Sequence, residues 1–112
     1  MPEASQFIYR IQPTRPAMLT EGPTPEEEAI ITEHFEYLKR LTEEDVALAV
    51  GRTMTTDVNA FGIVIFLADS EMEARRIMEN DAAVKKGVMK AELFPFRIAL
   101  LHDGWRIPGD KV

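Results

Sequence analysis

Residues 24–44 of this 112-residue chain read TPEEEAIITEHFEYLKRLTEE and carry its strongest helix signal. Thr24 is a hydroxyl N-cap, Pro25 stands at the first helical position, and Glu27 completes a capping box three residues after the cap. Apolar side chains and one histidine then recur at spacings of three and four, which places them on one helix face: Ile30, Ile31, His34, Leu38 and Leu41. The sequence therefore predicts an amphipathic helix with His34 on its inward face.

An inward-facing histidine has two interpretations. The ring can pack in the core and make one or two hydrogen bonds. It can also act as a general acid or base if a carboxylate orients its other ring nitrogen, because histidine side chains titrate near pH ~6.5. His34 alone does not decide between the two, and the second interpretation requires a partner elsewhere in the chain.

The composition limits the class of protein. With 46% hydrophobic and 29% charged residues, the chain fits one globular domain over residues 1–112, with a core at about 5–101 and a tail at 102–112. The formal net charge is −6 and the pI is about 4.9, and no cluster of lysines and arginines is present. Because phosphate neutralisation supplies most nucleic-acid affinity, we expect no DNA or RNA partner.

Two features that the sequence lacks limit the chemistry and the location that we expect. The chain has no cysteine, which removes disulfides, thiolate nucleophiles and thiolate metal ligands. Residues 1–10 lack the basic start and apolar run of a secretion signal, and no apolar run approaches the ~20 residues that span a bilayer. We therefore expect a cytoplasmic protein that does not bind membranes.

The remaining signals complete an α+β order. Apolar runs and alternation predict strands at 6–11, 46–50, 61–67 and 88–101. Ser70 and Glu73 form a second capping box before a helix that reaches Asn80, and Asp81 and Gly87 bracket one further helical turn. This order predicts a ferredoxin-like βαββαβ plait, a four-stranded antiparallel sheet with two helices on one face.

Prolines, a glycine and a tryptophan mark other positions. The segment 13–23 is too rich in proline for a helix, and it can be either a lid over a site or a stiff surface connector. Gly62 predicts a bulge or a close backbone approach, and Pro95 predicts an edge strand or a bulge. In the tail, we expect Trp105 to dock on another part of the protein.

The predicted sheet has more apolar surface than two helices can cover. The strands at 61–67 and 93–101 are apolar on both faces, whereas both helices lie on one face. Soluble monomers rarely expose a large apolar patch. We therefore expect a homodimer in which the uncovered sheet faces pack against each other.

Six short segments stand in order along residues 5–101: Gly22-Pro23-Thr24-Pro25, His34-Phe35-Glu36-Tyr37-Leu38, Phe61-Gly62-Ile63-Val64-Ile65-Phe66, Asn80-Asp81, Gly87-Val88 and Pro95-Phe96-Arg97. In their order and spacing they resemble the YCII-related (YciI-like) family. The resemblance implies a ferredoxin-like fold, dimeric α+β barrel assembly, and a site centred on a histidine and an aspartate that map to His34 and Asp81. Asp45 and Ala82 depart from the pattern, because a turn glycine and a proline are expected there.

Two functions are compatible with these residues. The first is a cofactor-independent enzyme in which His34 transfers a proton to or from a small, cyclic or aromatic organic compound and Asp81 holds the imidazole tautomer, as isomerisation, elimination or dehydrohalogenation would require. Arg10, Arg15 and Arg52 are candidates for binding an anionic substrate. The alternative is a non-catalytic small-molecule-binding or interaction module that uses the same dimer cavity, with Asp81 serving as an N-cap. No metal site is predicted, because His34 and Asp81 supply only two ligands.

Overall fold

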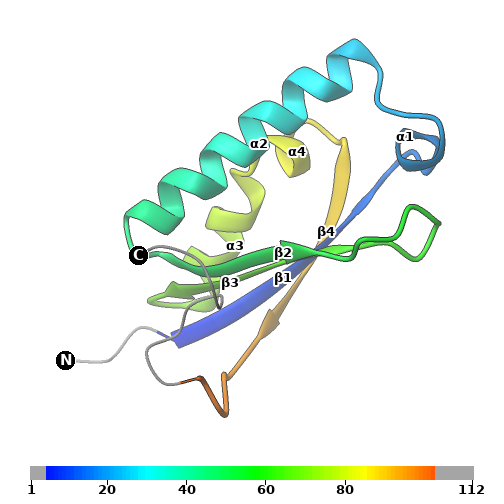
Figure 1. Ribbon diagram of the computed structural model, residues 1–112. Coiled ribbons are helices and arrows are strands. Elements are labelled where there is room, and N and C mark those ends of the chain that lie inside the picture. The colour runs from blue at the N-terminus through cyan, green and yellow to red at the C-terminus, as the bar shows by residue number, and fades with distance from the viewer. Residues whose placement is uncertain (1–4, 103–112) are drawn as a thin grey trace.

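The structure, a computed structural model, describes residues 5–102 and contains four strands and four helices in this part of the chain. The elements are β1 (Ser5–Pro13), α1 (Ala17–Thr20), α2 (Pro25–Glu43), β2 (Ala47–Arg52), β3 (Gly62–Ala68), α3 (Glu71–Glu79), α4 (Ala82–Lys85) and β4 (Met89–Pro95). The strands form one antiparallel sheet in the order β2-β3-β1-β4, and α2, α3 and α4 lie on one face of it (Figure 1). This confirms the predicted ferredoxin-like α+β plait. Trp105 lies outside the described residues.

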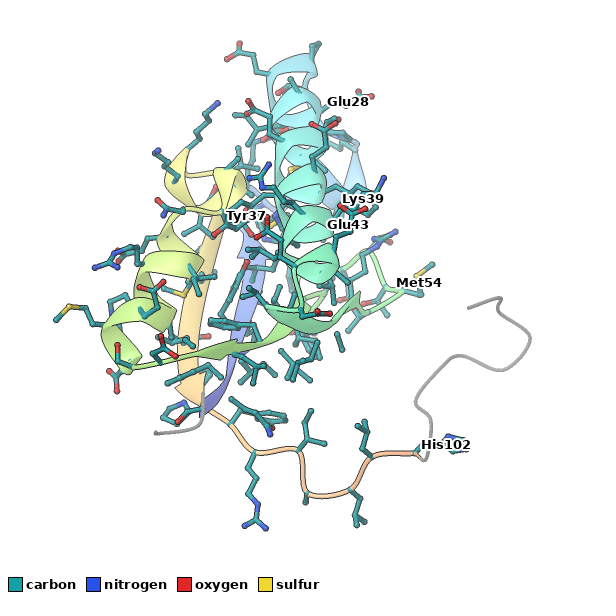
Figure 2. The ribbon with its side chains drawn as sticks, turned by 90° about the vertical axis from the view of Figure 1, so that its left-hand side faces the viewer. Glu28, Tyr37, Lys39, Glu43, Met54 and His102 are labelled. Atoms are coloured by element: carbon teal, nitrogen blue, oxygen red, sulfur yellow. The ribbon has the colours of Figure 1, made fainter. Side chains whose placement is uncertain are left out.

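The helix α2 begins where the capping signals predict. The Thr24 hydroxyl oxygen accepts a hydrogen bond from the Glu27 amide at 3.1 Å, and the Glu27 carboxylate accepts one from the Thr24 amide at 2.9 Å. Leu38 and Leu41 are buried on the inward face. Figure 2 shows Tyr37 on the side of α2 toward α3 and α4, and Lys39 on the side away from them. The amphipathic pattern therefore sets the rotation of α2 and turns His34 toward the sheet.

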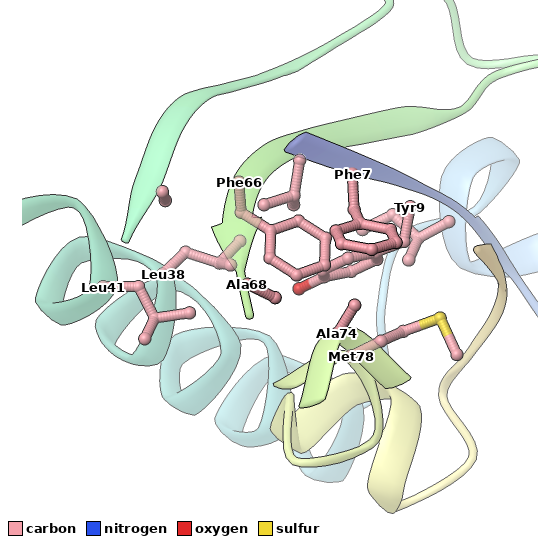
Figure 3. Packing of buried hydrophobic residues seen from close by; sticks show 11 residues of the cluster. Phe7, Tyr9, Leu38, Leu41, Phe66, Ala68, Ala74 and Met78 are labelled. Carbon is pink, nitrogen blue, oxygen red and sulfur yellow. The ribbon is translucent and has the colours of Figure 1, made fainter. Parts of the chain in front are cut away.

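The core lies between the sheet and the helices. Phe7 and Tyr9 of β1 pack against Phe66 of β3, and the Tyr9 and Phe66 rings meet edge to face with centroids 5.6 Å apart (Figure 3). Ala74 and Met78 of α3 close the same cluster. Alternate residues of β1 and β3 are buried in this layer, so the intervening residues lie on the opposite face of the sheet.

The last strand is shorter than predicted. We expected pairing over 88–101, but β4 ends at Pro95, which pairs with Phe7. After it, the Phe96 amide donates to the Gln6 carbonyl, and the Ile98 amide donates to the Gln6 side chain at 2.7 Å. At Ile98 the acceptor is thus a side chain and not the β1 backbone, so the regular ladder does not continue. The edge position predicted from Pro95 is confirmed.

The second strand is longer than predicted and carries the irregularity expected elsewhere. Gly51 and Arg52 belong to β2, and Arg52 pairs with Gly62 of β3. The register shift lies between Ala47 and Ala49. Gly62 instead marks a close approach, because a Cβ there would lie 3.2 Å from Ile11 Cγ1.

The segment 13–23 contains a helical turn that the sequence analysis did not predict. Pro16 has helical dihedral angles (φ −55°, ψ −29°) and stands just before α1, where a missing amide hydrogen costs no hydrogen bond. Met18 is buried and anchors the turn to the domain. Proline content therefore stops a helix from running through this segment but permits one to begin in it.

Both departures from the family pattern have local consequences. Asp45 has a φ of 63° after α2, which is the left-handed conformation that glycine adopts most readily and aspartate tolerates. Ala82 is the first residue of α4, where proline is favoured but not required.

In the described part of the chain, no helix has the length and apolar character needed to cross a membrane.

Candidate active site

His34 and Asp81 meet in the folded chain, as predicted, although 47 residues separate them. The His34 Nδ1 atom lies 2.7 Å from Asp81 Oδ1. The His34 side chain is 13% exposed and the Asp81 side chain is fully buried. Packing of α4 against α2 brings the two together, and an exposed ion pair between Lys86 and Glu33 at 2.8 Å joins the same two helices.

Asp81 accepts hydrogen bonds on both of its carboxylate oxygens. Oδ1 accepts from His34 and also from the Ala83 amide at 3.0 Å, which is the N-cap of α4. Oδ2 accepts from the Tyr9 hydroxyl at 2.7 Å. The cap and the imidazole therefore share Oδ1, whereas Tyr9 occupies Oδ2. An ionised carboxylate only accepts, so this network assigns the His34 proton to Nδ1.

Tyr9 is the member of the cluster that the sequence analysis missed. Burial raises the pKa of the Tyr9 phenol above its ordinary value, and the charge and hydrogen bond of Asp81 raise that pKa further. The hydroxyl therefore remains a neutral donor. The available signal was a single polar atom in the otherwise apolar row of Phe7, Tyr9 and Ile11, because a buried tyrosine hydroxyl needs a partner.

Tyr37 senses the same carboxylate from α2. Its hydroxyl donates to the Ile77 carbonyl at 2.8 Å, so it does not join the cluster. Burial, followed by the negative charge of Asp81, raises the pKa of Tyr37 to about 12. Both tyrosines near Asp81 therefore stay protonated around neutral pH. Of the two side chains that donate to Asp81, His34 is the one that lines a cavity.

A cavity of about 550 Å³ lies beside His34, between α2, the segment 13–23 and the strands β2 and β3. This volume is in the range of small-molecule sites. Its lining is mainly apolar: Ile11, Met18, Leu19, Ile31, Phe35, Leu38, Val50, Phe61 and Met89. Pro13, Met18 and Leu19 confirm that segment 13–23 borders the pocket. The cavity lies within one chain, on the helix side of the sheet.

The three predicted substrate-binding arginines separate in the structure. Arg52 lines the cavity. Arg10 does not, because it lies on the opposite sheet face, 3.5 Å from the Glu92 carboxylate and with its guanidinium 5.0 Å from the Phe61 ring centroid. Arg15 does not line it either, because its guanidinium makes a two-point contact with the Glu27 carboxylate at 2.9 and 2.6 Å.

The Arg15–Glu27 pair predicts an acid-dependent loss of stability. The hydrogen bond from Arg15, followed by the one from Thr24, lowers the pKa of Glu27 from 4.5 to about 2. As the pH falls below about 4.5, the unfolded chain takes up this proton first, so the stabilisation declines and is lost by about pH 2. We expect the Glu27→Gln variant to have a lower thermal midpoint than the wild type above pH 5, and the difference to vanish by about pH 2.

Glu28→Gln is the matched control, because Glu28 lies in the same first turn of α2 and has the same relation to the helix dipole. Glutamine at 27 keeps an acceptor for the capping box, so the comparison isolates the Arg15 pair. Equal acid dependence of the two variants would contradict the prediction.

Among residues 5–102, no three histidine, aspartate or glutamate side chains gather in a group that could hold a metal ion.

Comparisons with known proteins identify the family of the chain. The sequence model of the YCII-related domain matches residues 7–97. A chlorohydroxyhydroquinone dehydrochlorinase (TftG) from Burkholderia phenoliruptrix AC1100, solved with 2,5-dihydroxybenzoquinone, superposes with a TM-score of 0.59 at 19% identity, covering 81% of this chain and 93% of that chain. SnoaB, a cofactor-independent oxygenase from Streptomyces nogalater, superposes with a TM-score of 0.42 at 15% identity, covering 88% of this chain and 98% of that chain. No curated protein matches the chain.

At this identity the dehydrochlorinase structure shows a shared fold, whereas the family match covers most of the chain from β1 to just beyond β4. The matched region contains Tyr9, His34, Arg52 and Asp81. The chain belongs to the YCII-related domain family.

Proposed function

We propose that this protein is a cofactor-independent enzyme in which His34 transfers a proton to or from a small cyclic or aromatic compound. The observation that carries this proposal is the 2.7 Å contact between His34 Nδ1 and the buried Asp81 carboxylate, on a ring that also lines the cavity. A histidine held in this way has one nitrogen committed to the carboxylate and the other available for a ligand.

Asp81 supports the reaction through the imidazole. With the proton on Nδ1, the Nε2 atom carries the lone pair and can remove a proton from a substrate carbon or hydroxyl. The imidazolium that forms is stabilised by the adjacent carboxylate, which itself stays fixed by Tyr9 and Ala83. His34 then returns the proton at another position, as in an isomerisation, or the substrate loses a leaving group, as in an elimination. The fold shared with a dehydrochlorinase supports including halide elimination among the reactions to test.

The second candidate is the non-catalytic binding module. A mainly apolar cavity of this volume is sufficient to bind a small molecule without any reaction. Accessibility of the histidine separates the two functions. A structural histidine should be sealed by Ile31, Leu38 and the sheet, whereas an acid or base must reach the cavity. The 13% exposure of His34 and its place in the lining support the enzyme.

Hydrogen–deuterium exchange tests proton transfer without knowledge of the natural substrate. Cyclohexanone, tetralone and 4-oxocyclohexanecarboxylate are incubated with the protein in deuterium oxide, and loss of the proton signal next to the carbonyl is followed by NMR. If His34 removes and returns a carbon-bound proton, the wild type should exchange at least one probe faster than buffer does. Binding of these probes without exchange would favour the binding module, and exchange that survives in His34→Gln would remove His34 from the proposal.

We also propose that the protein is a homodimer joined through the open sheet faces. One cross-strand row on that face is apolar across all four strands: Ala49, Ile65, Ile8 and Phe94. Phe94 is 46% exposed in the single chain. A row of this kind, free of helices (Figure 1), is the surface that a second copy would cover.

Light scattering is expected to give about twice the chain mass of 12.7 kDa at tens of micromolar. Ile65→Glu should shift the protein to monomers, because it places a charge in the centre of the apolar row. Met72→Glu is the control, because Met72 is 74% exposed on α3, away from the sheet face. A wild-type monomer at this concentration would contradict the proposed assembly.

A further inference from the structure

The cavity beside His34 differs in charge from the rest of the protein. The chain carries 19 acidic and 13 basic side chains. Among the residues that line the cavity, no aspartate or glutamate occurs, and the only side chains that can carry charge are His34 and Arg52. Asp81 is fully buried behind the imidazole and does not line the cavity. The cavity therefore offers a permanent positive charge to a ligand.

The sheet register fixes the position of Arg52 relative to the acid–base group. Arg52 pairs with Gly62, and Gly62 pairs with Ile11, so these three residues form a row on the helix side. Arg52 lies two strands from Ile11, which is about 10 Å at the usual spacing between strands. Tyr9, which holds Asp81, lies two residues before Ile11 on the same side of β1. Arg52 and the His34 cluster therefore stand at opposite sides of the cavity floor.

Gly62 contributes no side chain to the middle of that floor, and the Ile11 side chain packs over it. Gly62 lines the cavity, and a Cβ added there would lie 3.2 Å from Ile11 Cγ1 and 3.4 Å from the Gly51 carbonyl. The floor beside Arg52 is thus formed by glycine backbone and the Ile11 side chain, an apolar surface that suits a flat or cyclic ligand body.

Arg52 also differs from the other two predicted arginines in its partners. Arg10 is paired with Glu92, and Arg15 makes its two-point contact with Glu27. No carboxylate in the described part of the chain lies within 4.0 Å of the Arg52 guanidinium. A planar guanidinium that is not already neutralised can form two parallel hydrogen bonds with a ligand carboxylate or a similar anion.

We propose that Arg52 binds an anionic group of the substrate, so that the substrate class is a small cyclic anion. Its acidic group lies at Arg52, its ring lies on the apolar floor formed by Gly62 and Ile11, and its reacting position faces His34. This inference rests on the proposed function for the role of His34. The anion site itself is independent of any reaction, because it can be measured by binding alone.

Benzoate and benzamide test the anion site as a matched pair, since they share a ring and differ in charge and neither offers a proton for exchange at carbon. Binding is followed by NMR chemical shifts of the protein. We expect benzoate to bind the wild type at least about tenfold more tightly than benzamide. Arg52→Gln should remove this preference, and Arg52→Lys should keep part of it because it retains charge without the planar geometry.

Arg75→Gln is the control, because Arg75 is a half-exposed arginine of α3 that pairs with Glu71 and does not line the cavity. It should keep the full preference for benzoate. Equal binding of benzoate and benzamide by the wild type, or a preference that survives in Arg52→Gln, would overturn the proposal. If Arg52→Gln does not fold, an Arg52 Nε–H signal that does not move when benzoate is added to the wild type overturns it equally.

The result is separable from that of the deuterium-exchange experiment. If Arg52 shows no anion preference but His34-dependent exchange is present, the substrate class is wrong and the proposed reaction stands. If the preference is present but exchange is absent, the anion site stands and the binding module replaces the enzyme.

Discussion

Replacing Asp81 with alanine is expected to lower the free energy of unfolding by about 3–5 kcal/mol, as for other buried charged groups whose partners are left unpaired. The carboxylate accepts hydrogen bonds from Tyr9, His34 and Ala83. Without it, the Tyr9 hydroxyl remains in a site with no exposure, and α4 loses its N-cap, which alone is worth about 1 kcal/mol. Urea denaturation at a fixed protein concentration measures the change.

Two variants divide this effect into its parts. Asp81→Asn keeps the shape and one accepting oxygen, so it retains the α4 cap and should cost much less than alanine. Tyr9→Phe removes one donor and leaves the carboxylate with His34 and Ala83, for an expected loss of about 1–3 kcal/mol. If alanine at 81 costs less than about 1 kcal/mol, the cluster does not stabilise the junction of α2 and α4 as described.

Asp81→Asn also separates stability from function. With its oxygen at the Oδ1 position, asparagine keeps the α4 cap and still accepts from His34 Nδ1, but it carries no charge to stabilise the imidazolium that forms when His34 takes up a proton. We therefore expect this variant to lose more activity than stability. The deuterium-exchange rate measures this loss, and an Asp81→Asn rate equal to that of the wild type would show that the carboxylate charge does not support His34.

The sequence was sufficient for features encoded by local pattern. The capping box at Thr24 and Glu27 and the spacing of Leu38 and Leu41 determine where α2 begins and which face it buries. Order and handedness rules then lead from the elements to the plait. Strand ends were predicted less well because they depend on partners: beyond Pro95 of β4, the Ile98 amide bonds to the Gln6 side chain and not to the backbone of another strand.

The site was predicted in its central pair but not in its surroundings. The helix pattern singled out His34, and the family resemblance paired it with Asp81. Tyr9 has only one polar atom and resembles any core aromatic residue in the pattern of β1. The three arginines looked equivalent in the sequence. Their positions relative to the cavity depend on tertiary structure. The sheet register places Arg10 on the face opposite Arg52, and the α1 turn brings Arg15 to Glu27.

Replacing His34 with glutamine is expected to lower the exchange or turnover rate by about 10²–10⁴-fold, the usual contribution of a positioned acid or base. Glutamine has similar length and can still donate to Asp81 Oδ1, but it cannot accept and return a proton near neutral pH. The fold should therefore survive, and the loss should appear in the rate rather than in the urea midpoint.

His102 provides the matched control for this variant, because it is the second of the two histidines in the chain and lies exposed beyond β4. His102→Gln should retain the wild-type rate, which excludes a general effect of histidine content or of weak buffering by the protein. A loss smaller than about tenfold in His34→Gln would mean that the imidazole contributes less than 1.4 kcal/mol to the barrier, too little for the acid or base of the reaction. His34 would then be one more hydrogen-bond donor to a buried carboxylate, and the cavity would be a binding site whose specificity comes from Arg52 and its apolar walls.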